Sequence, residues 1–224
     1  MTSPHPVPPL PQPQQPVQAA RALAEAAHAA AGAWAQPLDP HRHGRSVSQL
    51  YSALRDTGIA VRGLAAWQPD GAPSGAAPAE FARHVTSAAG WLLTAWNGLE
   101  GVLAAEGFGP LPDPDEPGAA LCRAARGALR AWRQPDGTVA DRDAAVRQLI
   151  TATGFLSAGA LGLAAYAPPH RAADLQAVCA GLAEVAADLA AAVHESADGA
   201  APGQHYAGPE PGPEAEPRQP GARE

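Results

Sequence analysis

Apolar residues recur at alternating steps of three and four along most of the chain, and this pattern restricts the fold more than any other feature. One series runs through the segment 79–106: Phe81, Val85, Ala88, Leu92, Ala95, Leu99 and Val102. A later series is equally regular: Leu175, Val178, Leu182, Val185, Leu189 and Val193. Each series places one apolar stripe along a helix, and such a stripe has to be buried against other helices. The pattern therefore predicts a helical bundle.

The composition extends this prediction to the whole domain. Ala supplies 56 of the 224 residues, whereas aromatic residues make up 5%. Ala has the highest helix propensity, and the β-branched and aromatic residues that favour strands are scarce. We therefore expect an all-α fold.

Prolines and capping signals divide the domain into about six helices. Gln-Pro pairs predict helix ends, because a residue before Pro is disfavoured in the α conformation. Two capping boxes, "SVSQ" from Ser46 and "TVAD" from Thr138, predict helix starts. The expected helices, arranged as an up-and-down bundle, cover about 17–36, 46–67, 79–106, 117–134, 138–167 and a last segment that contains Leu175 to Val193.

Large aromatic residues lie near the predicted C-terminal ends of the first five helices. In an up-and-down bundle, successive helix ends alternate between two poles. We therefore expect Trp34, Trp96 and Tyr166 at one pole, with Trp67 and Trp132 at the other. Helix contacts that consist mostly of Ala bury little apolar area. Bulky rings at both poles would add buried area and cover the two ends of the core.

The chain divides into an arm, one helical domain and a tail. The arm, 1–16, is rich in Pro, and the tail, 198–224, is rich in Gly, Pro and Glu, so we predict that both are disordered. Within the domain, 17–197, two units of three helices resemble each other, which indicates an internal duplication of 17–107 as 117–197.

Two short matches carry this duplication. "AWAQP" (33–37) resembles "AWRQP" (131–135), and "TGIAVRG" (57–63) resembles "TGFLSAG" (153–159). Gly inside a helix costs up to about 1 kcal/mol relative to Ala, so it needs a packing reason. We expect close helix crossings at four glycines: Gly58, Gly63, Gly154 and Gly159.

Charge and cysteine usage limit the class of protein. The formal net charge of −7 argues against a protein that coats nucleic acid through bulk charge. All fifteen basic residues are Arg, which, with the abundant Ala, Gly and Pro, is typical of a high-GC bacterium. Cys122 and Cys179 form no disulfide framework, and the first residues lack the pattern of a signal peptide, so we predict a cytoplasmic protein.

The most distinct polar feature is a row of arginines on the predicted helix 117–134. Arg123, Arg126, Arg130 and Arg133 fall on one side of that helix, opposite its apolar residues. Such a row, here called the Arg stripe, could bind phosphates or an acidic protein surface, or could be a solvated face. No nucleic-acid recognition motif accompanies it.

Other candidate sites are weaker. Trp91 and Trp96 on the third predicted helix could line a small-molecule pocket. The histidines, including "HRH" at 41–43 in a predicted loop, lack the spacing of metal ligands, so we predict neither a metal nor a cofactor. The segment 149–167 has no charge, and we interpret it as a bundle helix surrounded on all sides rather than as a membrane span.

These observations predict a non-enzymatic helical bundle that acts through protein–protein interaction or self-association. The sequence contains no nucleophile with a base, no phosphate-binding loop and no paired carboxylates in an apolar stretch. Two alternatives stay open: a small-molecule-binding or regulatory bundle, and a nucleic-acid-associated accessory protein that uses the Arg stripe.

Overall fold

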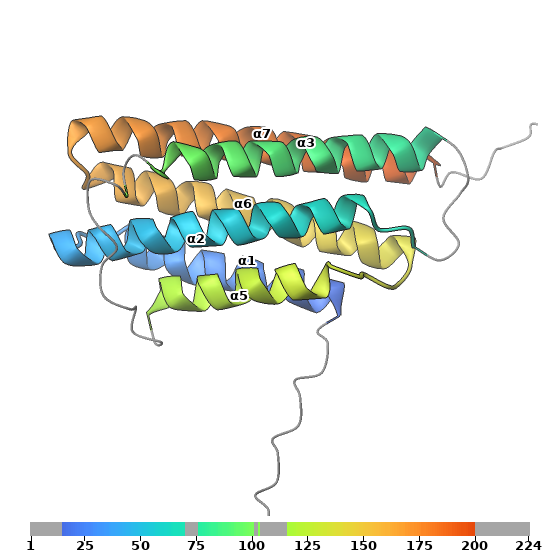
Figure 1. The fold of residues 1–224 in the computed structure, drawn as a ribbon, viewed down its shortest axis with the longest axis horizontal. Helices are drawn as coiled ribbons and strands as arrows, with labels where there is room; N and C mark the ends of the chain where they lie inside the picture. The colour runs from blue at the N-terminus through green and yellow to red at the C-terminus, as the bar shows by residue number, and fades with distance from the viewer. Residues whose placement is uncertain (1–14, 70–75, 101–102, 104–115, 200–224) are drawn as a thin grey trace, which may run out of the picture.

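The structure, a computed structural model, describes residues 15–69, 76–100, 103 and 116–199. These residues form helices and no strand, as the sequence predicted (Figure 1). The helices are α1 (Pro16–Trp34), α2 (Pro40–Ala65), α3 (Ala76–Gly98), α5 (Pro117–Ala131), α6 (Val139–Ala165) and α7 (Pro169–Gly199).

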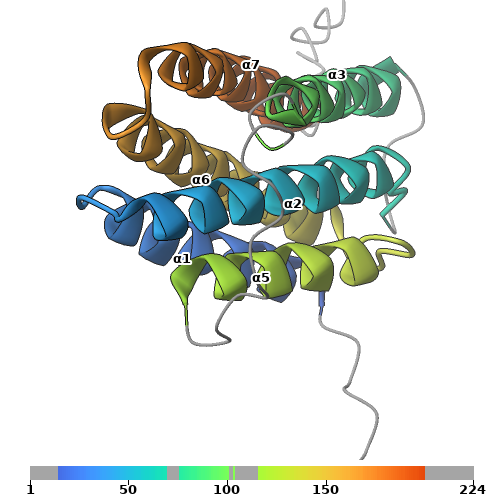
Figure 2. The ribbon, with the colours of Figure 1, turned by 60° about the vertical axis from the view of Figure 1, so that its left-hand side comes forward.

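The helices form three layers of two. In both views α3 and α7 make one outer layer, α2 and α6 the middle layer, and α1 and α5 the other outer layer (Figures 1 and 2). Each layer combines one helix from the first half of the chain with the corresponding helix from the second half. A single apolar core of Ala, Leu, Val and aromatic residues runs through all six.

The two halves exchange their first helices. α1 packs against α6 and α5 packs against α2, while α3 and α7 stay on the middle helix of their own half. At one crossing the ring of Trp34 lies against Gly159, where an added Cβ would be 2.8 Å from the ring. At the other, the backbone carbonyl of Trp132 occupies the place of a Cβ on Gly63. The duplication stays a prediction.

Three of the five aromatic residues at helix ends are buried as expected. Trp34, Trp67 and Trp132 are each at most 3% exposed. Trp67 and Trp132 lie at the same pole. Trp67 is beside Gly137 in the turn between α5 and α6, and this turn begins directly after Trp132. The cluster expected at the other pole is incomplete. Trp96 packs against Tyr51, a residue of α2, with ring centroids 5.5 Å apart. Tyr166 is 46% exposed.

The start of α2 differs from the prediction, because the sequence contains another helix-start signal before Ser46. α2 begins at Pro40, and the Asp39 side chain accepts a hydrogen bond of 3.0 Å from the Arg42 N–H. Asp followed by Pro gives an N-cap and a preset first turn, so Ser46 lies inside the helix and the prediction of a cap there is wrong. "HRH" at 41–43 accordingly lies in α2 and not in a loop.

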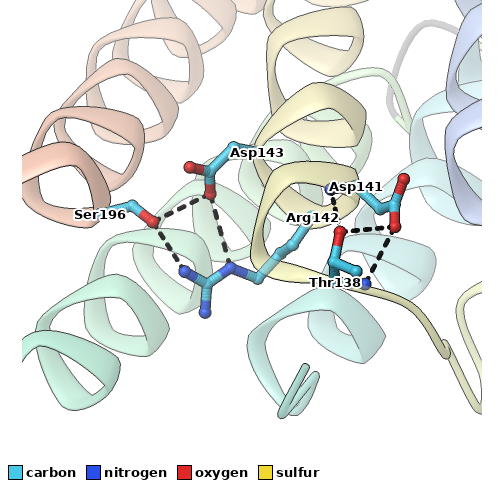
Figure 3. A network of polar contacts seen from close by, with 5 residues as sticks. All are labelled: Thr138, Asp141, Arg142, Asp143 and Ser196. Atoms are coloured by element: carbon cyan, nitrogen blue, oxygen red, sulfur yellow. Dashed lines mark hydrogen bonds and ion pairs between the residues drawn. The ribbon is translucent and has the colours of Figure 1, made fainter. Parts of the chain in front are cut away.

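The second capping box is confirmed. The Thr138 hydroxyl accepts from the Asp141 N–H at 3.2 Å, and the Asp141 carboxylate accepts from the Thr138 N–H at 2.9 Å (Figure 3). The hydroxyl and the backbone N–H of Thr138 also hold the pKa of Asp141 below its usual range. The helical domain extends from Pro16 to Gly199, slightly beyond the predicted 17–197. Most of the predicted disordered arm and tail, 1–14 and 200–224, lies outside the described residues.

The glycine crossings generate a paired test. We expect Gly63→Ala to lower the free energy of unfolding by about 2 kcal/mol, because the added methyl group meets the backbone of Trp132 and forces the helices apart. Gly90 on α3 has nothing within 4 Å of its Cβ position, so Gly90→Ala should raise stability by up to about 1 kcal/mol. Urea denaturation followed by circular dichroism measures both, and equal effects would contradict the packing at Gly63.

Candidate functional site

The structure divides the Arg stripe into two parts. All four arginines lie on or directly after α5 and are exposed. Arg126 approaches Asp56 on α2, with 3.5 Å between Nε and Oδ2. The Asp56 side chain is only 4% exposed and also accepts two hydrogen bonds from Arg55. Arg126 therefore helps to neutralise the buried carboxylate of Asp56. Arg123 also has an interaction partner.

The other two arginines line a cavity at the pole of Trp132. This cavity of about 900 Å³ lies between the start of α1 and the end of α5. Its walls are Gln15, Pro16, Arg130, Ala131, Arg133, Gln134 and Asp136. A second cavity, of about 180 Å³, shares Gln15, Pro16 and Asp136 with it. The Arg stripe and a cavity therefore meet at one place, which sequence reasoning did not predict.

Trp91 and Trp96 have different surroundings. Trp91 is 40% exposed on the outer side of α3. Trp96 is half-buried against Tyr51, and its indole nitrogen is buried without a hydrogen-bond partner. Five residues rotate a helix by about 140°, so the two rings leave α3 in different directions. A pocket shared by the two rings stays an untested prediction.

A buried polar network, absent from the sequence predictions, connects α6 with α7. Arg142 donates a hydrogen bond of 2.8 Å to the Ser196 hydroxyl, which donates one of 2.9 Å to Asp143 (Figure 3). Arg142 and Asp143 also form an ion pair, and the guanidinium lies 3.8 Å from the ring centroid of Phe81 on α3. All three polar residues are at most 9% exposed. This network holds three helices together at one pole.

Burial governs the chemistry of this network. Desolvation lowers the pKa of Arg142, and the charge of Asp143 partly opposes that effect. The serine hydroxyl donates to the Asp143 carboxylate, which is a weak base because the Arg142 guanidinium already neutralises it, and no histidine of the described residues contacts the hydroxyl. The Ser196 environment therefore does not resemble an activated nucleophile.

The remaining polar contacts also lack a catalytic arrangement in the described part of the chain. His84 Nδ1 lies 3.7 Å from Asp188 Oδ1 between α3 and α7, with Arg83 rather than a serine at its other nitrogen. His43 is buried, and its Nε2 lies 2.9 Å from the Leu163 carbonyl oxygen. Among the described residues no three His, Cys, Asp or Glu side chains come together in a group that could hold a metal ion.

Both cysteines are half-buried and donate to backbone carbonyls. Cys122 Sγ lies 3.3 Å from the Gln49 oxygen on α2, and Cys179 Sγ lies 3.4 Å from the Ser157 oxygen on α6. Burial raises the pKa of Cys122 to about 11, although the nearby Arg126 lowers it in part. Burial also raises the pKa of Cys179. Neither thiol is activated toward nucleophilic chemistry at neutral pH.

The charge-free segment of α6 has an exposed side, so the prediction that this helix is surrounded on all sides is wrong. α6 packs against α1 and α7 and touches α2, and its outer surface faces solvent. This surface, here called the α6 face, consists of Thr151, Gly154, Ala158, Leu161 and Ala165. By length and composition α6 and α7 could each cross a membrane, a criterion that core helices of soluble bundles also meet.

No family model, curated protein or solved structure matches this chain.

The buried ion pair predicts a large effect of removing one partner. Asp143→Ala should lower the free energy of unfolding by about 3 kcal/mol, because it leaves the Arg142 charge buried without its counter-ion. Ser196→Ala should lower the free energy of unfolding by about 1 kcal/mol, because it removes the hydrogen bonds to Arg142 and Asp143. The matched control Asp174→Ala, an exposed acid on α7, should change stability by less than about 0.5 kcal/mol. Chemical denaturation of the three variants tests this order, and an Asp143 effect as small as that of Asp174 would contradict it.

The raised pKa of Cys122 predicts slow alkylation. In a Cys179→Ala variant, iodoacetamide at pH 8 should react about a hundred times more slowly with the folded chain than with the urea-unfolded chain, since the pKa is about 11 instead of 9.0. The neutral thiol favours the folded state, so this contribution to stability is complete below pH 9 and is lost as the pH rises toward 11. Equal alkylation rates for the two states would show that Cys122 is not buried.

Proposed function

We propose that this chain is a non-enzymatic helical bundle that acts by protein–protein interaction, through association of two copies at the α6 face. The observation that carries this proposal is the contrast between the exposed surfaces of α2 and α6. In the matched segments Arg55 on α2 corresponds to Thr151 on α6, and Arg62 corresponds to Ala158. All four residues are exposed, but only those on α2 are charged.

The α6 face has the size and shape that a helix-to-helix contact needs. The face runs from Thr151 to Ala165, about 21 Å along the helix, which is long enough for two helices to cross on it. Leu161, one turn before the end of this face, is its largest apolar side chain and is 57% exposed. Gly154 and Ala158 have little or no side chain, so a second helix can approach closely there.

A second copy fits this face better than a partner of opposite charge. In a symmetric dimer the same surface meets itself, so charged residues near the axis would face like charges. The α6 face has none. Each copy has a formal net charge of −7, and electrostatic repulsion between copies is smallest where their uncharged surfaces meet.

Light scattering during size-exclusion chromatography tests the proposal. At 100 µM we expect twice the chain mass of 22.7 kDa for the natural chain and one chain mass for Leu161→Arg. Ile59→Arg is the matched control, because Ile59 is 43% exposed on α2 and lies outside the α6 face, and it should remain a dimer.

Two outcomes would overturn the proposal. A natural chain that elutes as a monomer at 100 µM would exclude self-association at relevant concentrations. A dimer that Leu161→Arg leaves intact while Ile59→Arg dissociates it would place the interface on α2.

A further inference from the structure

Arg130 and Arg133, at the end of the Arg stripe, have no acidic partner in the part of the chain that the structure describes. Six other arginines in the described ranges form ion pairs with Asp or Glu, among them Arg126 with Asp56. Within the described residues neither Arg130 nor Arg133 has an ion pair or a hydrogen bond. Arg130 lies in the last turn of α5 and Arg133 lies two residues after its end, so two like charges that repel each other border the same cavity. An anion placed between them would relieve this repulsion.

The protein holds the backbone that carries these two arginines in place beside a cavity. Trp132, which lies between them in the sequence, is fully buried. Its indole N–H donates a hydrogen bond of 3.1 Å to the carbonyl oxygen of Pro16. This bond joins the end of α5 to the start of α1, and these two elements form the walls of the cavity. A volume of about 900 Å³ lies within the range of small-molecule sites.

The start of α1 adds positive potential to the same cavity. α1 has no acidic residue in its first turn, and no side chain caps it. The partial positive charge at its N-terminus is offset in part by two carboxylates, that of Asp136 in the same cavity and that of Asp141 in the adjoining one. Gln15 and Pro16, which begin this helix, line the cavity together with the two arginines. The helix end supports an anion site whose main cations are Arg130 and Arg133.

We propose that this cavity binds a small organic phosphate, with the phosphate group between Arg130 and Arg133. Guanidinium groups bind phosphate oxygens through paired, charge-assisted hydrogen bonds, and two of them match a phosphate dianion. The amides of Gln15 and Gln134 offer donors and acceptors for hydroxyl groups of the same ligand. The site therefore fits a sugar phosphate or a nucleoside monophosphate.

Asp136 restricts the ligand to one phosphate group. Its carboxylate lines the same cavity, and it repels a second phosphate near the arginines. A nucleic-acid strand, with a phosphate at every nucleotide, would also meet the net negative charge of the chain. The cavity therefore favours a small monoanionic or dianionic ligand over a polyanion. This inference does not depend on the proposed dimer.

Calorimetric titration of the full chain with adenosine monophosphate and ribose 5-phosphate tests the site. We expect saturable binding of at least one of them, and weaker binding of inorganic phosphate. The double variant Arg130→Gln/Arg133→Gln should weaken that binding by about tenfold for each arginine removed. The control Arg83→Gln/Arg147→Gln removes the same charge outside the cavity and should change the affinity by less than about twofold.

A further variant separates loss of binding from loss of folding. Asp136→Asn keeps both arginines and should tighten phosphate binding, because it removes the repelling carboxylate. No binding of either organic phosphate at millimolar concentration would overturn the proposal. Equal loss of binding in the two double variants would also overturn it, since it would show a response to overall charge rather than to this cavity.

Discussion

The exchange of helices depends on one kind of contact. In it, a tryptophan at the end of one helix lies against a glycine inside another. Trp34 lies on Gly159, and the backbone of Trp132 lies on Gly63. Each contact joins the first helix of one half to the second helix of the other. A side chain larger than hydrogen at either glycine would separate the crossing helices, and the thin Ala-rich core between them would lose its packing.

Polar groups inside this core hold its helices in one relative position. Ala and Leu pack with little directional preference, so neighbouring helices could slide by a turn at small cost. Asp56 between Arg55 and Arg126 connects α2 with α5, and the network of Arg142, Asp143 and Ser196 connects α6 with α7. These bonds form only in one register, and we infer that they contribute specificity more than net stability.

Local signals in the sequence predicted the helices well and their partners poorly. Helical periodicity, the Gln-Pro stops and the capping box at Thr138 depend on nearby residues, and the structure confirms them. The start at Ser46 was wrong because Asp39 and Pro40 offer a stronger start seven residues earlier. The exposed side of α6, the network around Arg142 and the cavity at Arg130 arise from contacts over long sequence separations, which periodicity does not encode. The Arg stripe was visible in the sequence, but its division was not, since the pairing of Arg126 depends on the position of α2.

The exchange of first helices also determines when the molecule can fold during synthesis. α1 finds its main partners in α5 and α6, so its apolar side has no place to pack until more than a hundred further residues have left the ribosome. Contacts between distant parts of a chain form slowly, and nascent helices with open apolar sides are prone to aggregate. α2 and α3 can pack on each other early, whereas α1 keeps an open apolar side until α5 and α6 emerge and complete the core.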